Sequence, residues 1–220
     1  MINEKRIYLL ILFGSIFCLI LSHAFFQNYL FMQPCEQCIY VRFAFCVLIL
    51  ACILLCFKFV KFLGFSLAFF GIFCGLKASL KLMQIHAALL SNNPFLASCS
   101  NFPHFAFNIP LDKFFPSLFT ITGICGLDAP TPPSDVNLSV TQSFFVELYS
   151  QGWYLIPKYH FITMAEASTL IFALILLLLF MLFLKKLDLK LKFVSFILFL
   201  ALIFLAWLGF FDYNLLFSRR

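Results

Sequence analysis

Long apolar runs without charge constrain the fold of this chain more than any other feature. The run from Ile7 to Phe26 contains no Asp, Glu, Lys or Arg. A helix of about 20 predominantly apolar residues can cross the hydrocarbon core of a bilayer, so this run is long enough to span a membrane. Of the 220 residues, 64% are hydrophobic and only 11% are charged, outside the range of soluble domains. The composition therefore predicts an integral membrane protein in contact with the lipid bilayer. It excludes a disordered chain and a soluble nucleic-acid-binding protein.

Runs of this kind predict an all-α bundle of four transmembrane helices. A cleaved signal peptide is the alternative for the first run, because Ser22-His23-Ala24 resembles a small-x-small cleavage pattern, but we favour an uncleaved helix. A fifth C-terminal membrane helix is expected at 193–211, although Arg219 and Arg220 would then end outside and the segment could instead lie on the interface. The four expected spans are 7–27, 38–57, 62–83 and 161–184.

The positions of the basic residues indicate which side of the membrane is cytoplasmic. With the N-terminus inside, three short stretches would hold eight of the 15 Lys and Arg residues. The others would be spread over much longer outside segments, and a high density of positive charge marks the cytoplasmic side. We therefore expect a multi-pass protein whose N-terminus is cytoplasmic. The eight residues are Lys5, Arg6, Lys58, Lys61, Lys185, Lys186, Lys190 and Lys192.

Two outside segments, 28–37 and 90–160, connect the expected spans, and 90–160 is the only long polar region of the chain. The longer one holds seven prolines between positions 94 and 133, and this composition is typical of loops and turns. Within it, the stretch 143–156 predicts a short helix on the outer membrane surface, because its apolar residues share one helical face and it contains Trp and Tyr. The residues on that face are Phe144, Phe145, Leu148 and Tyr149.

The nine cysteines divide by their depth in the membrane. Five fall inside the expected spans, where a buried cysteine usually behaves as a small inert hydrophobic residue. The other four are Cys35, Cys99 and Cys125 in the two outside segments and Cys38 at the outer end of the second span. An even set of cysteines in an oxidising compartment can form disulfides, so we expect these four to carry the chemistry. The five in the spans are Cys18, Cys46, Cys52, Cys56 and Cys74.

Cys35-Glu36-Gln37-Cys38 is a C-x-x-C pair whose spacing alone leaves its chemistry open. It could bind zinc, act as a redox couple or belong to two structural disulfides. Haem attachment would require His directly after the pair, where the chain has Ile39. No metal site is expected, because Cys99 and Cys125 lie 26 residues apart and lack the spacing of most zinc sites. A C-x-x-C ring is small and strained, which favours an exchangeable bond over a structural one.

Arg42 lies close to this pair, at the edge of the second span. It follows Cys38 by four residues, so the two side chains would share one face of the helix. Cys38 would lie near the N-terminus of that helix, where the helix dipole favours a thiolate. An Arg at the edge of a membrane is costly unless it has a function. We expect Arg42 to stabilise the Cys38 thiolate and an anionic oxygen of a cofactor; an interfacial anchor is the alternative.

The string Pro34-Cys35-Glu36-Gln37-Cys38-Ile39-Tyr40-Val41-Arg42 resembles the signature of the disulfide bond formation protein B (DsbB) family, the membrane thiol oxidases. Cys99 and Cys125 resemble that family's second pair in spacing and position. His86, 13 residues before Cys99, resembles a family residue at the quinone pocket. The resemblance covers residues 5–185, while the 193–211 segment and the region around Trp153 look closer to the DsbI-like branch.

The resemblance implies a relay of disulfide exchange. A reduced, DsbA-like thioredoxin-fold partner in the periplasm would attack the Cys99–Cys125 disulfide at Cys99. Cys125 would then exchange with the Cys35–Cys38 pair at Cys35. Cys38 would pass electrons to a membrane quinone, ubiquinone or menaquinone, near Arg42 and His86. The protein would thus be a quinone-dependent protein dithiol oxidase of a bacterial inner membrane.

Two other functions are compatible with the sequence. A vitamin K epoxide reductase-like protein also combines a C-x-x-C pair, a quinone and a helical bundle, but there the pair is expected on the last helix. A membrane protein without enzymatic activity could hold the four cysteines in structural disulfides. The polar Glu36 and Gln37 stand where the DsbB family commonly has apolar residues, and we expect this difference to shift the potential of the couple.

Four residues outside the cysteine segments have simpler interpretations. Gly71 and Gly75 form a G-x-x-x-G motif in the third span, which we interpret as close helix packing within the bundle. Glu166 near the outer end of the fourth span is interpreted as a solvated helix end. His23 in the first span is expected only to pack.

Overall fold

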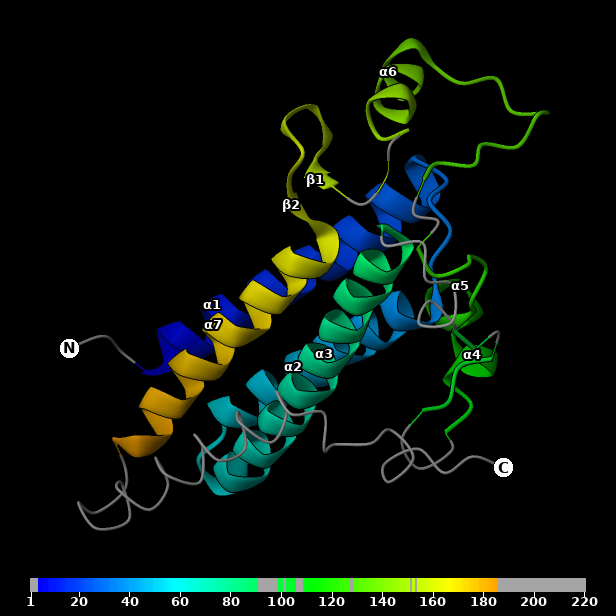
Figure 1. The fold of residues 1–220 in the computed structure, drawn as a ribbon. Coiled ribbons are helices and arrows are strands. Elements are labelled where there is room, and N and C mark those ends of the chain that lie inside the picture. Colours follow the sequence, from blue (N-terminus) through cyan, green and yellow to red (C-terminus); the bar gives the residue numbers. More distant parts are fainter. Residues whose placement is uncertain are drawn as a thin grey trace.

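Four long helices form the body of the protein in a computed structural model (Figure 1). Each is long and apolar enough to cross a membrane, so the expected all-α membrane bundle is confirmed. The expected fifth helix at 193–211 lies outside the described residues. The helices are α1 (Glu4–Ile20, continued by a π-helical segment Leu21–Tyr29), α2 (Glu36–Cys56), α3 (Lys61–Leu90) and α7 (Met164–Leu184). The structure describes residues 4–90, 99–100, 102–105, 109–126, 129–150, 152 and 154–185.

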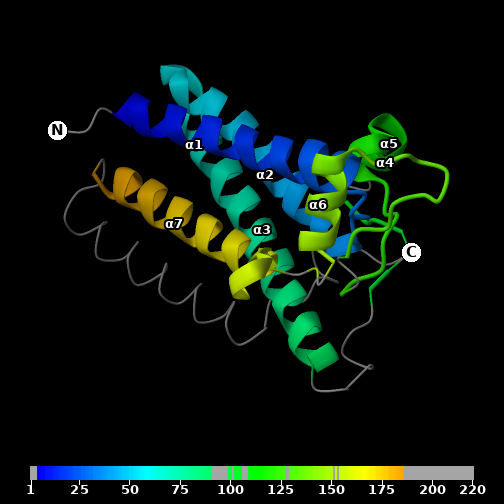
Figure 2. The ribbon, with the colours of Figure 1, turned by 90° about the horizontal axis from the view of Figure 1, so that it is seen from above.

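Helix α2 packs against both α1 and α3, and α3 also packs against α7, as the view from above in Figure 2 shows. A 3-10 turn, Lys58–Val60, joins α2 to α3 as an antiparallel hairpin. Gly71 and Gly75 allow these close approaches. A Cβ atom at Gly71 would lie 2.9 Å from Val47 of α2, and one at Gly75 would overlap the ring of Phe172 of α7. The G-x-x-x-G motif therefore serves packing inside the bundle, as the sequence indicated.

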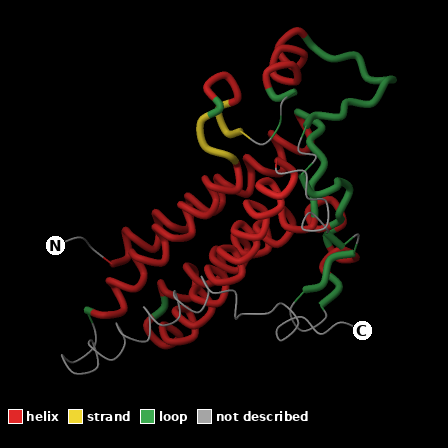
Figure 3. Tube along the Cα trace, in the orientation of Figure 1, coloured by secondary structure: helices red, strands yellow, loops and turns green. Residues whose placement is uncertain are grey.

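Short elements gather at one end of the bundle, where α1 ends and α2 begins (Figures 1 and 3). Strands β1 and β2 form a two-stranded antiparallel sheet in which Tyr154 pairs with Thr163 and Ile156 pairs with Phe161. A 3-10 turn, Pro157–Tyr159, connects them. The short elements are α4 (Leu111–Phe114), α5 (Pro116–Phe119), α6 (Val140–Leu148), β1 (Tyr154–Ile156) and β2 (Phe161–Thr163).

The surface helix expected at 143–156 is shorter and begins earlier than the sequence predicted. Ser139 caps α6 by accepting a hydrogen bond from the Gln142 N–H at 3.2 Å, so the helix starts at Val140. It ends at Leu148, and Gly152 then takes a positive φ of 56° before β1 begins. The prediction of a helix through residue 156 is wrong, because its last residues pair as a strand instead.

The apolar face of α6 packs on the end of the first membrane helix. Tyr149 is buried, and its ring meets those of Phe25 and Phe26 edge to face at 6.5 and 5.5 Å. Phe145 meets Phe25 in the same way at 5.7 Å, whereas Phe144 remains 62% exposed. The face that the sequence assigned to the membrane surface is therefore used mainly in tertiary packing.

Glu166 has a defined structural role at the start of α7. Its carboxylate accepts hydrogen bonds from the Thr163 N–H at 2.7 Å and the Thr163 hydroxyl at 2.9 Å. The Thr163 hydroxyl oxygen in turn accepts the Glu166 N–H at 3.1 Å, which completes a capping box. The interpretation of Glu166 as a merely solvated helix end is therefore corrected. The helix starts at Met164 because residues 161–163 belong to β2.

Candidate redox site

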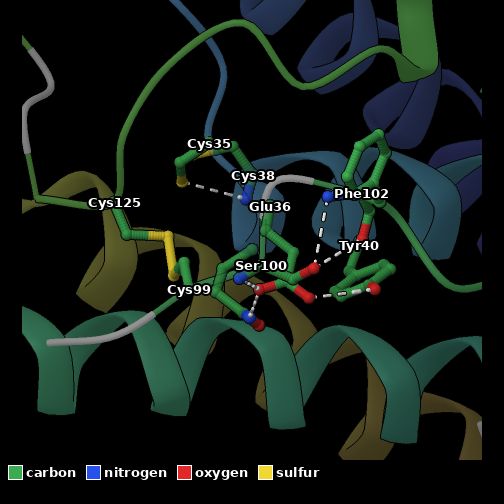
Figure 4. The surroundings of a disulfide bond; sticks show 9 residues. Cys35, Glu36, Cys38, Tyr40, Cys99, Ser100, Phe102 and Cys125 are labelled. Carbon is green, nitrogen blue, oxygen red and sulfur yellow. Dashed lines mark hydrogen bonds between the residues drawn. A yellow bond between two sulfur atoms is a disulfide. The ribbon is translucent and has the colours of Figure 1, made fainter. Parts of the chain in front are cut away.

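The four outside cysteines lie together in one hydrophobic cluster near the start of α2 (Figure 4). Cys99 and Cys125 form a disulfide with a Cα–Cα distance of 6.1 Å, while Cys35 and Cys38 are in the thiol form. Cys35 is fully buried and Cys125 is 5% exposed. The cluster also contains Leu82 and Ile85 of α3 and Ala165 of α7. Two segments that are far apart in the sequence are thereby brought within reach of each other.

Cys35 is the capping residue of α2. Its backbone is extended, with φ −81° and ψ 172°, and its sulfur accepts the N–H of Cys38 at 3.4 Å. The positive end of the helix dipole therefore faces the Cys35 sulfur, which favours a negative charge there. Cys38 lies near the helix N-terminus, as expected, but at the third helical position, because the helix begins at Glu36 and not at Cys38.

The segment that leads to Cys125 is held against the first outside loop by main-chain hydrogen bonds. The Pro34 carbonyl accepts the N–H groups of Thr122 at 3.2 Å and Gly123 at 3.0 Å. Gly123 permits this contact because a Cβ atom there would overlap the Gln33 carbonyl. These contacts keep Cys125, two residues further on, next to the C-x-x-C pair.

The segment that follows Cys99 is held by side chains instead. Glu36, 7% exposed, accepts the Ser100 N–H at 2.8 Å and the Tyr40 hydroxyl at 3.2 Å (Figure 4). The Tyr40 oxygen in turn accepts the His104 N–H at 2.8 Å. Sequence reasoning assigned Glu36 only an effect on the potential of the couple and missed these contacts. The one available signal was an acidic residue where the DsbB family commonly has an apolar one.

Arg42 is buried in α2, with 4% of its surface exposed. It donates hydrogen bonds to the Ser22 carbonyl at 2.9 Å, to the Leu118 carbonyl at 3.3 Å and to the side-chain oxygen of Gln27. Among the described residues, none of its hydrogen bonds goes to a cysteine sulfur. The expected stabilisation of the Cys38 thiolate by the charge of Arg42 therefore stays a prediction. Two of its acceptors come from the π-helical segment of α1, a rare geometry that is frequent at functional sites.

Gln27 is the residue at this site that sequence reasoning missed entirely. Its amide nitrogen donates to the Ser117 carbonyl at 3.2 Å, and its oxygen lies 3.2 Å from Nδ1 of His23. His23 therefore does more than pack. A signal was present in the sequence, because His23 and Gln27 are polar residues four positions apart at the end of an otherwise apolar run.

His86 is buried on α3 and is 4% exposed. Its neighbour Ile85 belongs to the cysteine cluster, so His86 lies near the cysteines but on a different helix from Arg42. Met83, one turn earlier, packs against the same cluster and also lines a cleft of about 550 Å³. A volume of this size suits a small organic molecule. The cleft is lined by Met83, His160, Phe161, Ile162, Glu166, Thr169 and Leu170.

Comparison with known proteins identifies the family to which the chain belongs. The family model for "Disulfide bond formation protein DsbB" matches residues 4–182, which is most of the chain. The chain is a member of the DsbB family. It is accordingly a multi-pass membrane protein and an oxidoreductase. No solved structure matches it.

Several related proteins carry the name DsbI, in agreement with the DsbI-like features of the sequence. The chain is 42% identical to "Protein-disulfide oxidoreductase DsbI" of Escherichia coli O1:K1 / APEC over 80% of this chain and 84% of that protein. It is 40% identical to "Putative protein-disulfide oxidoreductase DsbI" of Campylobacter fetus subsp. fetus, over 82% of this chain and 86% of the relative. A Campylobacter jejuni protein of the same name is 38% identical over 82% of this chain and 74% of its own length.

Proposed function

We propose that the protein is a quinone-dependent dithiol oxidase that reoxidises a thioredoxin-fold partner outside the cytoplasm. The observation that carries the proposal is the single cluster of Cys35, Cys38, Cys99 and Cys125, in which one pair is oxidised and the other reduced. Such a cluster allows a disulfide to move from one pair to the other by direct exchange. The names of the relatives, which describe protein-disulfide oxidoreductases, support the same chemistry.

The relay begins with a reduced, DsbA-like partner. A partner thiolate attacks Cys99, so a partner–Cys99 bond forms, the Cys99–Cys125 bond breaks and Cys125 leaves as a thiolate. Cys125 attacks Cys35 of a Cys35–Cys38 disulfide, and Cys38 leaves as a thiolate. The second partner thiol displaces Cys99 and releases the oxidised partner. Cys99 then displaces Cys35 from Cys125, so the electron pair and two protons of the partner dithiol end on Cys35 and Cys38.

The position of Cys35 supports this order. Cys35 and Cys125 are the two buried cysteines of the cluster, which places the sulfurs that exchange away from water. The N-terminus of α2 faces the Cys35 sulfur and stabilises negative charge on it when Cys125 is recaptured by Cys99. Leaving-group stability of this kind sets the direction of thiol–disulfide exchange.

The residues around Arg42 fit an oxygen-bearing acceptor. The Nε of Arg42 is buried and has no hydrogen-bond partner among the described residues, so it can donate to an added oxygen. We assign Arg42 and His86 as the residues that hold a membrane quinone, either ubiquinone or menaquinone. A quinone bound there would supply the oxidant, taking two electrons and two protons from Cys35 and Cys38. Met83 both lines the cleft and packs against the cysteine cluster, which supports access of a small molecule from that side.

The proposed setting is a bacterial inner membrane, with the N-terminus in the cytoplasm and both cysteine pairs in the periplasm. The distribution of Lys and Arg supports this orientation by the positive-inside rule. Lys5 and Arg6 lie in the first turn of α1, and Lys61 begins α3 at the end of the bundle opposite the cysteines. A periplasmic site is reachable by a soluble partner and by the quinone pool.

The test mixes the purified protein with a quinone and a reduced thioredoxin-fold dithiol and follows the absorbance of the quinone. We expect reduction that depends on the dithiol, and a loss of about a hundredfold or more in Cys38→Ala and in Cys99→Ala, because each removes an obligatory exchange step. Cys56→Ala, which changes a cysteine at the inner end of α2, is the matched control and should retain activity. Absence of quinone reduction, or full turnover in either site variant, would refute the proposed relay.

A further inference from the structure

The two arms of the Cys99–Cys125 disulfide are anchored in different ways. The Cys125 side is held by main-chain hydrogen bonds from Thr122 and Gly123 to Pro34. The Cys99 arm, defined here as residues 99, 100 and 102–105, is instead hydrogen-bonded to α2 through two side chains, Glu36 and Tyr40, while Phe105 packs against the rings of Tyr40 and Phe43. A side-chain anchor can be removed by substitution while the main-chain anchor is kept. A mutation should therefore be able to displace the Cys99 sulfur without displacing the Cys125 sulfur.

Glu36 is the centre of the side-chain anchor. It stands between the two cysteines of the C-x-x-C pair in sequence, and its carboxylate accepts the N–H of the residue directly after Cys99 (Figure 4). The same carboxylate accepts a hydrogen bond from the Tyr40 hydroxyl, whose oxygen accepts the His104 N–H. One carboxylate is thereby linked to two main-chain N–H groups of the Cys99 arm, directly at Ser100 and through Tyr40 at His104.

The chemistry of Glu36 suits this task. A carboxylate has acceptor sites for several donors at once, and hydrogen bonds to an ionised acceptor are stronger than neutral ones. Glu36 is the first residue of α2, where the helix dipole favours a negative charge, and it is 7% exposed, so water competes little for its oxygens. An alanine here would leave the Ser100 N–H without its acceptor.

We propose that Glu36 is a positioning residue that holds the Cys99 arm, and not the Cys125 arm, beside the C-x-x-C pair. This role deepens the proposed function, on which its significance rests, because the last step of that relay requires Cys99 to recapture Cys125. Glu36 itself exchanges no electrons. Its hydrogen bonds, direct to the Ser100 amide and through Tyr40 to the His104 amide, fix the position of the Cys99 sulfur.

The test measures the formation of two different cross-links in the full-length protein. One background, Cys38→Ser with Cys125→Ser, can form only the Cys35–Cys99 bond within the site. The other, Cys38→Ser with Cys99→Ser, can form only Cys35–Cys125. Diamide is the oxidant, and it takes up the two electrons and two protons that two thiols release on forming one disulfide. The rate is followed on non-reducing gels and the bond is identified by peptide mass spectrometry, without a partner or a quinone.

Glu36→Ala should slow Cys35–Cys99 formation about tenfold, the factor that corresponds to one charge-assisted hydrogen bond, and change Cys35–Cys125 formation by less than about twofold. Glu147→Ala removes an exposed carboxylate from α6 and is the matched control; it should affect neither rate. Tyr40→Phe removes only the hydroxyl that links Glu36 to His104 and should slow the same bond by about threefold. Equal slowing of both bonds by Glu36→Ala, or slowing of neither, overturns the proposal.

Hydrogen exchange at the Ser100 amide provides a readout that does not depend on sulfur chemistry. It should be faster in Glu36→Ala than in the parent protein, and an unchanged rate would also overturn the proposal. Should Glu36→Ala fail to fold, the selectivity of Tyr40→Phe between the two bonds decides the question. The role of Glu36 and the proposed function can fail separately. If Glu36→Ala slows only Cys35–Cys99 formation but the parent protein reduces no quinone, the role of Glu36 is retained and the dithiol oxidase function is refuted.

Discussion

Arg42 on α2 donates a hydrogen bond to the side-chain oxygen of Gln27, which lies 15 residues earlier on the π-helical end of α1. The amide nitrogen of the same Gln27 donates to the Ser117 carbonyl of α5. One amide therefore links the buried arginine, the first membrane helix and an outer segment. Arg42 is thus positioned by polar partners on α1 and α5, and the cysteines are not needed to hold it.

Replacing Gln27 by Leu should destabilise the protein by about 1–3 kcal/mol, because the buried guanidinium loses an acceptor that no water replaces. The measurement is the midpoint of denaturant-induced unfolding in detergent. Gln84→Leu removes the same side chain from an exposed position on α3, and its effect should stay within about 0.5 kcal/mol. Similar midpoints for the two variants would contradict the structural role of Gln27.

Replacing Arg42 by Lys should raise the apparent KM for quinone by about tenfold, because an ammonium cannot reproduce the planar set of donors that serves several oxygens at once. Steady-state rates at varied quinone concentration give the value. Arg6→Lys makes the same exchange at an exposed position near the start of α1 and should leave the KM unchanged. An unaltered KM in Arg42→Lys would remove Arg42 from the proposed quinone site.

Replacing Gly75 by Ala should lower the free energy of unfolding by about 1–3 kcal/mol, since the added methyl group would overlap the ring of Phe172 and force α3 and α7 apart. Gly14→Ala is the matched control, because a Cβ atom at Gly14 would meet no other atom within 4 Å. Thermal unfolding of both variants in the same detergent tests the difference. Equal stability of the pair would show that the packing of α3 on α7 tolerates a side chain.

Replacing Thr163 by Val removes one half of the capping box at the start of α7 and should lower the free energy of unfolding by about 1 kcal/mol. Unfolding in denaturant measures the loss. Thr120→Val changes an exposed threonine outside this capping box and should have little effect. A loss in Thr120→Val as large as in Thr163→Val would argue against the capping role of Thr163 and Glu166.

Tyr149 should make stability depend on pH in the alkaline range. Burial raises the pKa of its hydroxyl above the usual 10.0, and this hydroxyl donates to the Leu155 carbonyl at 3.0 Å. Because the pKa is raised in the folded state, the neutral hydroxyl of Tyr149 makes its full contribution to the free energy of unfolding below pH 10.0. That contribution is lost as the pH rises through the folded-state pKa. Unfolding midpoints from pH 8 to 11 should therefore fall less steeply in Tyr149→Phe than in the parent. Tyr159→Phe, at a position 72% exposed, should follow the parent.

The membrane helices could be predicted from the sequence because their cause is local. Each apolar run is long enough to span a bilayer by itself, and helix formation satisfies its main-chain groups without help from other segments. The limits of the short outer elements could not be predicted in this way. Helix α6 is stabilised by the rings of Phe25 and Phe26, more than a hundred residues earlier, and short helices depend on such packing.

The sequence by itself determined the membrane class, the four long helices and the separation of the cysteines into five deep in the spans and four at or beyond their outer ends, because hydropathy is a property of each segment. Only the tertiary structure decided what surrounds those four cysteines. Gln27 reaches Arg42 across 15 residues and Glu36 reaches Ser100 across 64, distances at which no local pattern connects one residue to the other. These contacts arise because a buried charge requires hydrogen-bond partners, and the fold supplies them from whichever segments pack beside it.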